Sequence, residues 1–162
     1  MPERPAVNAS PLICLARAGL VHLLGLAGDH VIVPKQVADE ILRRGAEDPT
    51  ARALHENPWL VVTEVPTIPS AIQAWGLGDG EAPVLAWGLT HPGAEVIIDD
   101  LAGRRCAAAF RLPVRGTLGL VLEAKETGRI ALARPVLLQL RQAGMYLSDS
   151  VVARALAEVG EA

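Results

Sequence analysis

The sequence predicts an α/β fold: a three-layer α/β/α sandwich with a mostly parallel central sheet, followed by a helical C-terminal tail. Short apolar runs rich in valine and isoleucine alternate with segments of helical periodicity, as in parallel sheets that helices cover. After Gly116 only helical patterns follow. The 162 residues contain no internal repeat and no linker-like run, so we expect a single domain over residues 1–162.

The first expected strand, AVNAS, ends at Asn8. Ser10 is the expected cap of the helix LICLARAG, because serine is a common N-cap residue and the proline after it suits the first helical turn. Gly19 ends this helix, and LVHLLGLAG forms a second short one. The first strand therefore ends on a polar side chain directly before a helix.

The second expected strand, HVIVP, leads into the helix KQVADEILRRG, whose apolar face is formed by Val37, Ile41 and Leu42. Gly45 closes this helix. A polar connection with a short helix, AEDPTARALHENP, follows, and WLVVTEVP is the third strand. These elements extend the alternation of strands and helices.

The prolines and glycines of PTIPSAIQAWGLGDG indicate a loop or short helix. The next helix, DGEAPVLAWGLTH, has Asp79, Glu81 and Pro83 in its first turn. It is followed by the strand AEVIID, the helix DLAGRRCAAAFR and a short last strand, LPVRG. Three helical segments that end in glycine complete the chain: TLGLVLEAKETG, ALARPVLLQLRQAG and SDSVVARALAEVG.

Composition narrows the class of protein. The formal net charge of −3 argues against coating nucleic acid through bulk positive charge, so any contact with nucleic acid would be local. The apolar stretch LICLARAGLVHLLGLAG is broken by Arg17 and His22, so we expect no membrane span, and no signal peptide is recognisable. Cys14 and Cys106 fit reduced core thiols. We therefore expect a cytoplasmic protein.

Polar residues with oxygen ligands recur where strands end and helices begin. Because ligands gather at the carboxyl edge of a parallel sheet, these side chains are expected to converge there. Several carboxylates in one place repel each other unless a cation neutralises them. Oxygen ligands without histidine or cysteine suit Mg²⁺ or Mn²⁺. The candidate metal ligands are Asn8, Glu40, Glu81, Asp99 and Asp100.

Each acid also has an ordinary structural explanation. Glu81 in a first helical turn complements the helix dipole. Glu40 can be a solvated residue that pairs with the arginines after it. Asp99 or Asp100 can cap the following helix. The metal site is favoured by the acids in combination, not by any one of them.

Four stretches in order, VNASPLI, IVPKQVADEIL, GDGEAPVLAW and VIIDDLAGRR, resemble PIN-domain proteins. More specifically, the chain resembles the PIN-like predicted nucleic-acid-binding subgroup, which is often encoded beside a small helix-turn-helix antitoxin. RGTLGLVLEAKETGRI and LRQAGMYLSD resemble the C-terminal half of that subgroup. The resemblance covers nearly the whole chain, from about Ala6 to about Val152.

The resemblance implies a single PIN-like domain with Mg²⁺- or Mn²⁺-dependent ribonuclease activity, as in the toxins of VapBC-type toxin–antitoxin pairs. Glu40 matches the second family acid, Glu81 the third, and Asp100 the fourth, with Asp99 beside it. These four acids are the candidate catalytic residues. Asn8 departs from the family, because most active members have aspartate there, and an amide lowers the charge of the site.

Three further residues are candidates for substrate binding. Ser10 resembles the small hydroxyl residue that follows the first family acid, although a helix cap alone would explain it. Arg104 and Arg105 follow the acid pair and suit the phosphate backbone of RNA, or alternatively a salt bridge.

The leading hypothesis is a metal-dependent endoribonuclease that acts as a toxin, with RNA as substrate, a small antitoxin as partner and a homodimer as the expected assembly. The alternative is a catalytically weak or inactive PIN-like module that binds nucleic acid or an antitoxin, because Asn8 replaces the usual first acid. A phosphatase or phospho-receiver is disfavoured, since the acid pair is not spaced as DxD.

Overall fold

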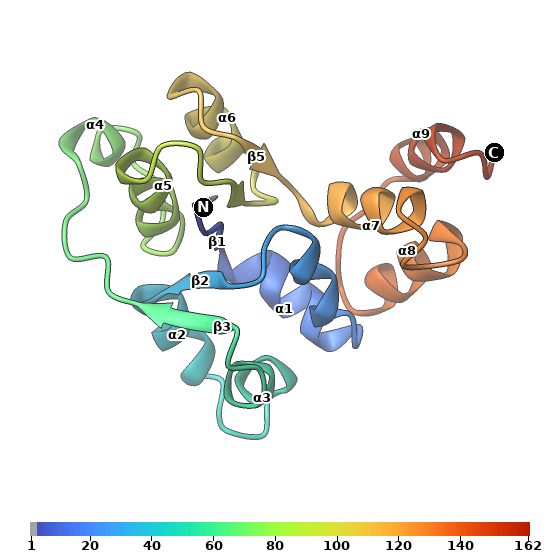
Figure 1. Cartoon of the computed structure of the whole chain (residues 1–162), viewed down its shortest axis with the longest axis horizontal. Coiled ribbons are helices and arrows are strands. Elements are labelled where there is room, and N and C mark those ends of the chain that lie inside the picture. The colour runs from blue at the N-terminus through green and yellow to red at the C-terminus, as the bar shows by residue number, and fades with distance from the viewer. Residues whose placement is uncertain (1–2) are drawn as a thin grey trace.

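A five-stranded, all-parallel sheet forms the centre of the computed structural model, which describes residues 3–162 (Figure 1). The strand order is β3-β2-β1-β4-β5, and every neighbouring pair is parallel. The strands are β1 (Ala6–Val7), β2 (Val31–Pro34), β3 (Leu60–Thr63), β4 (Val96–Ile97) and β5 (Val114–Arg115). Strands β1, β2 and β4 are buried throughout, which explains their continuous apolar sequences.

The strand order reverses at β1. The chain builds β1, β2 and β3 in one direction and then returns to the other side of β1 to add β4 and β5. Ala6 of β1 pairs with Ile32 of β2 on one side and with Val96 of β4 on the other. Open sheets bind ligands outside the carboxyl ends of the strands at such a reversal. The residues that follow β1 and β4 therefore occupy the favoured place for a site.

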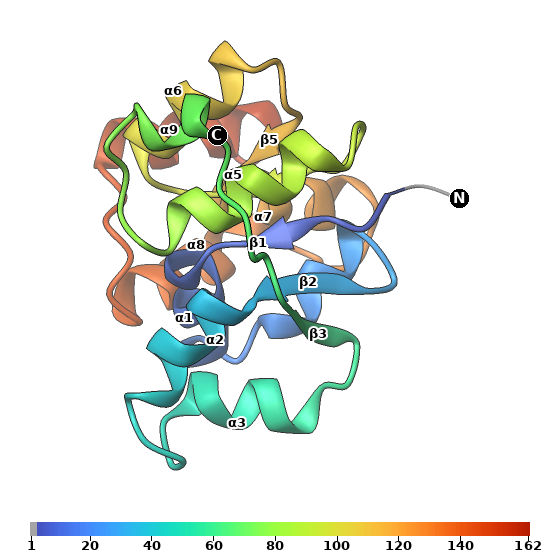
Figure 2. The same cartoon turned by 90° about the vertical axis from the view of Figure 1, so that its left-hand side faces the viewer.

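Helices cover both faces of the sheet. Right-handed crossovers place the helices that follow β1 and β2 on one face and those on either side of β4 on the other. Accordingly, α1, α2 and α3 contact one another, whereas α5 contacts β1, β2, β4 and α6 (Figure 2). The helices of these layers are α1 (Ala9–Arg17), the 3-10 helix η1 (Val21–Leu26), α2 (Lys35–Leu42), α3 (Pro49–Glu56), α4 (Ser70–Gln73), α5 (Glu81–Thr90) and α6 (Leu101–Ala109). The predicted α/β/α class is confirmed.

The helical tail is also confirmed. It consists of α7 (Thr117–Glu126), α8 (Ala133–Gln142) and α9 (Asp149–Glu158), which lie on the opposite side of the molecule from α4 (Figure 1). α7 contacts η1 and α8, and α8 contacts α1 and α9. Leu120, Leu137 and Leu140 of the tail are buried in the same hydrophobic core as the strands. The tail is thus part of the main core.

Two local predictions were wrong. Helix α1 begins at Ala9 with Asn8 at the N-cap position, so Ser10 lies inside the first turn and is not the cap. Leu42 is 56% exposed and does not belong to the apolar face of α2. The buried face of α2 is formed by Val37, Ala38 and Ile41, whereas Leu42 lies beyond its margin, about 140° around the helix from Val37.

In residues 3–162 no helix is both long enough and apolar enough to cross a membrane. The apolar stretch near the N-terminus is divided between α1 and η1, with Gly19 in the left-handed region at φ +72° between them. Cys14 and Cys106 are free thiols, in line with the prediction.

Candidate functional site

Asn8 stands at the centre of the carboxyl edge, between the ends of β1 and β4. Its side chain is nearly buried, at 3% exposure, and its backbone N–H donates to the Ile97 carbonyl at 3.0 Å. The amide makes no capping hydrogen bond to α1. Instead Nδ2 donates to Oε1 of Glu81 at 3.4 Å. A polar side chain at an N-cap position has therefore been turned toward the acids.

Gly80 allows Asn8 and Glu40 to approach the same point. A Cβ atom on Gly80 would lie 3.2 Å from Oδ1 of Asn8 and 3.4 Å from Oε2 of Glu40. Glu40 reaches this point from α2, on which it is otherwise exposed. The structure thus gathers Asn8, Glu40 and Glu81 around one glycine, although their segments are far apart in sequence.

Asp100 lies on the other side of Glu81. It is the N-cap residue of α6, where Oδ2 accepts the Gly103 N–H at 2.9 Å. A Cβ atom on Gly103 would lie 3.6 Å from Cγ of Glu81 and 3.7 Å from Oδ2 of Asp100. Glu81 itself is the first residue of α5. The positive ends of two helix dipoles therefore face this pair of acids and stabilise their charge.

Asp99 is turned toward the tail. Its Oδ1 accepts the Thr117 N–H at 2.7 Å, and its Oδ2 accepts the Thr117 hydroxyl at 2.7 Å. Thr117 is fully buried at the start of α7. The two adjacent acids thus have different partners: Asp100 caps α6 and Asp99 binds the first residue of α7. A role for Asp99 as a metal ligand stays a prediction.

Among residues 3–162 no three acidic, histidine or cysteine side chains stand close enough together to hold an ion by themselves. The oxygens instead line an open cleft that has two parts. One part, of about 570 Å³, includes Asn8, Glu40 and Glu81. The other, of about 930 Å³, includes Glu81, Asp99 and Asp100. Ser10, Cys14 and Glu81 line both parts, so the two parts adjoin at the sheet edge.

Arginines surround the acids. Arg17, Arg43 and Arg44 line the smaller part of the cleft. All three are exposed, but Arg44 is held by Asp48, whose Oδ2 lies 3.2 Å from its Nε. These residues were missed as candidates from sequence, since Arg43 and Arg44 looked like partners for Glu40. For Arg43 and Arg44, the signal that would have found them is their position just after the turn of α2 that holds Glu40.

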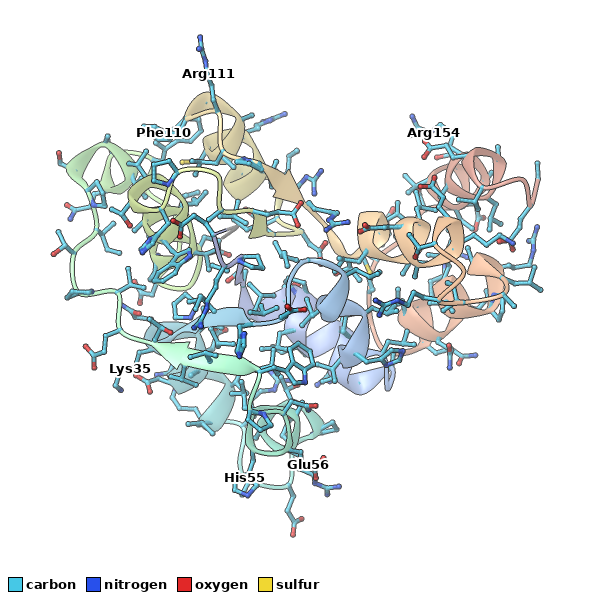
Figure 3. The ribbon with its side chains drawn as sticks, in the orientation of Figure 1. Lys35, His55, Glu56, Phe110, Arg111 and Arg154 are labelled. Carbon is cyan, nitrogen blue, oxygen red and sulfur yellow. The ribbon has the colours of Figure 1, made fainter. Side chains whose placement is uncertain are left out.

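Of the two arginines predicted to bind substrate, only Arg104 lines the cleft. It is half-buried, and its Nη1 donates to the Ile98 carbonyl at 3.2 Å. Arg105 is exposed on the next position of α6. At the far end of this helix, Arg111 points away from the sheet (Figure 3). Only one basic residue of the helix therefore faces the acids.

Charged residues of the cleft shift the pKa of the Cys14 thiol. Burial raises the pKa of this thiol, the charge of Asp99 raises it further, and Arg17 lowers it. Cys14 lines both parts of the cleft. Its thiol is thus a natural reporter of charge at the site.

A family model described as DUF3368: PIN domain matches residues 5–161. Neither the curated proteins nor the solved structures that were compared with the chain include a match.

Proposed function

The chain belongs to the PIN-domain family, and from this membership we propose that it is a Mg²⁺- or Mn²⁺-dependent endoribonuclease. The observation that supports the proposal best is the meeting of Asn8, Glu40 and Glu81 around Gly80. Asp100 lies beside Glu81 at the same reversal of strand order. Three carboxylates and one amide from separate segments therefore meet at the edge of the sheet where ligands are expected.

The residues fit a hard divalent cation. The side chains near Gly80 offer oxygen atoms as metal ligands, from Asn8, Glu40 and Glu81. Oxygen is the ligand that Mg²⁺ and Mn²⁺ prefer. Mg²⁺ usually keeps several waters and needs only one or two carboxylates, which suits an open cleft. When bound, such an ion supplies positive charge and lowers the pKa of water, so that hydrolysis of a phosphodiester becomes possible.

We assign the residues as follows. Glu81 would contact the cation, and Glu40 and Asp100 on either side of it would bind the waters that the ion keeps, while Asn8 orients Glu81 through its amide N–H. Asp99 fixes the first turn of α7 beside the cleft. A second set of residues is assigned to the phosphates of RNA: Arg17, Arg43 and Arg104, with Ser10 exposed between the two parts of the cleft.

Cleavage of RNA in the presence of Mn²⁺ tests the proposal. Glu81→Gln and Asp100→Asn should each reduce the rate by at least about 100-fold, since even outer partners of metal ligands contribute 10–100-fold. Asparagine keeps an oxygen to cap α6, so Asp100→Asn separates loss of charge from loss of fold. Glu64→Gln, at an exposed position just after β3, is the matched control. Equal rates in all variants, with contaminating nuclease excluded, would refute the proposal.

We further propose that the chain is the toxin of a toxin–antitoxin pair, with a small antitoxin as partner and a homodimer as its assembly. Expression of the parent should arrest growth, and Glu81→Gln should not. Light scattering on the purified protein measures the assembly. Growth arrest by Glu81→Gln equal to that of the parent would argue against a nuclease toxin.

The second candidate function is a catalytically weak module that binds RNA or an antitoxin through the same cleft. Asn8 favours it, because its amide donates to Glu81 where a carboxylate would add a negative charge. RNA binding without cleavage at any concentration of Mn²⁺ would select this alternative.

A further inference from the structure

Tyr146 combines high exposure with a place in the cleft. It is 89% exposed, and it is the single tyrosine of the chain. It lines the larger part of the cleft together with Glu81, Asp99 and Asp100. Aromatic side chains are the surfaces on which unpaired nucleobases stack.

The backbone holds Tyr146 in this exposed position. On its N-terminal side, Gly144 adopts φ +106° and the Met145 N–H donates to the Leu140 carbonyl at 3.0 Å. On its C-terminal side, the Leu147 carbonyl accepts Nε of Arg141 at 3.0 Å and Nη2 at 2.7 Å. The backbone that carries Tyr146 is therefore anchored on both sides, in the connection between α8 and α9.

A second exposed apolar group lines the same part of the cleft. Leu101 is 60% exposed and begins α6 immediately after Asp100. Arg104, one turn further along α6, adds a positive charge. A nucleobase needs apolar surfaces for its faces, and its phosphate needs a cation nearby. This part of the cleft therefore provides apolar surface and a positive charge in the same pocket as the acids.

We infer that Tyr146 forms a subsite for an unpaired nucleobase of the RNA, on the opposite side of the acids from Arg17 and Arg43. This inference rests on the proposed function, since the acids mark where the phosphodiester lies. RNA is favoured over a protein as the occupant because this part of the cleft itself contains the acids and Arg104 beside Tyr146. Tyr146 is a positioning residue, because it contacts a base and not the reacting phosphate.

The single tyrosine allows a direct test. Protein labelled with 3-fluorotyrosine gives one ¹⁹F resonance, which belongs to Tyr146. The labelled Glu81→Gln variant is titrated with a short oligouridylate in Mg²⁺, which is diamagnetic and leaves the resonance sharp, then with an abasic oligonucleotide of the same length and with an RNA duplex. The resonance should shift with oligouridylate and stay unchanged with the other two. An equal shift with the abasic strand, or no shift with oligouridylate, would overturn the inference.

Two outcomes separate this inference from the proposed function. If the unlabelled parent cleaves RNA but the Tyr146 resonance does not respond, the subsite fails and the nuclease stands. If oligouridylate shifts the resonance but the parent cleaves nothing, the base contact stands and the nuclease fails. A shift that depends on protein concentration alone would show that a second copy covers the ring, which also overturns the inference.

Variants give a second measurement. Tyr146→Ala should weaken binding of oligouridylate by roughly 5- to 150-fold, the range for loss of one stacked base. Tyr146→Phe should bind within about twofold of the parent, since stacking uses the ring and not the hydroxyl. Because the side chain is exposed, neither change should alter the melting temperature. Equal losses in both variants would point to the hydroxyl and contradict stacking.

Discussion

Asp99 accepts two hydrogen bonds from Thr117, one from the backbone N–H and one from the hydroxyl, each 2.7 Å long. This pair joins the residue after Ile98 at the sheet edge to the first residue of α7, although 18 positions separate them in sequence. Burial is the main cause of the raised pKa of the Cys14 thiol, and the charge of Asp99 raises this pKa further. One acid thus connects the sheet edge with the helical tail and influences the cleft.

Thr117→Val should lower the free energy of unfolding by about 1.5–3 kcal/mol. Valine has nearly the same shape but leaves one oxygen of Asp99 without its donor, and hydrogen bonds to charged groups have this magnitude. Thr117→Ser keeps the hydroxyl and should cost about 0.8 kcal/mol for one buried methyl group. Urea denaturation measures both. Equal losses would show that the hydroxyl contributes nothing.

Asn8→Asp should destabilise the metal-free protein by about 1–3 kcal/mol, because a nearly buried acid replaces the donor to Glu81. Mn²⁺ should recover this loss and raise the melting temperature more than it does in the parent. Thermal unfolding at increasing Mn²⁺ concentrations measures the effect. Asn57→Asp, at the end of α3, is the control and should show no added response to Mn²⁺.

Cys14 should react slowly with iodoacetamide at neutral pH, because burial and then Asp99 raise the pKa of its thiol. A divalent cation at the acids adds positive charge, so saturating Mg²⁺ should accelerate the reaction. Mass spectrometry follows the modification, and the buried Cys106 serves as the internal control. A rate at Cys14 that is unchanged by Mg²⁺ would argue against a cation in the cleft.

Arg43→Ala should weaken RNA binding and reduce its dependence on salt. Arg43 is exposed on the wall of the cleft, and one lost phosphate contact lowers the slope of log affinity against log salt by roughly 0.7 for a single strand. Fluorescence anisotropy at several salt concentrations measures the slope. The control is Arg154→Ala, whose side chain projects outward from α9 and lines neither part of the cleft (Figure 3).

Glu161 should make the tail sensitive to acid. The N–H of Ala133 donates to this carboxylate at 2.6 Å and holds its pKa below the ordinary value, with further help from Arg134 and Lys125. A depressed pKa stabilises the fold above the ordinary glutamate range, near 4.3, and the benefit disappears as the pH falls through the lowered pKa.

The comparison of Glu161→Gln with the parent tests this dependence. The difference in melting temperature should be large at pH 7 and should shrink as the solution becomes acidic. Glu126→Gln, at the exposed end of α7, controls for general loss of charge. If the difference in melting temperature were the same at every pH, the stabilisation would not depend on the ionisation of Glu161.

The sequence predicted the fold well because the inner strands β1, β2 and β4 are continuous apolar runs, as is typical of a buried parallel sheet. Val31, Ile32 and Val33 are apolar in succession, and all three are buried. The exact start of α1 was not predictable, because Asn8, Ala9 and Ser10 are all acceptable near a helix N-terminus. The choice among them follows from the bond between the Asn8 N–H and Ile97 of β4, a residue far away in sequence.

The site was predictable in part. Glu81 and Asp100 begin helices that follow the sheet edge, so topology alone brings them together. The approach of Glu40 to Asn8 beside Gly80 is a contact between distant segments, which no local pattern reveals. The orientation of Asp99 depends on Thr117, and the exposure of Tyr146 depends on how Arg141 anchors the next connection. These are relations between distant segments and require coordinates.

The reversal of strand order has a consequence for synthesis of the chain. Asn8 emerges from the ribosome first, but β1 gains its second neighbour only when β4 has been made and has docked. A nascent polypeptide that stops short of β4 holds an incomplete edge, with Asp100 still missing. The edge that gathers Asn8, Glu81 and Asp100 is therefore complete only after most of the chain has been synthesised.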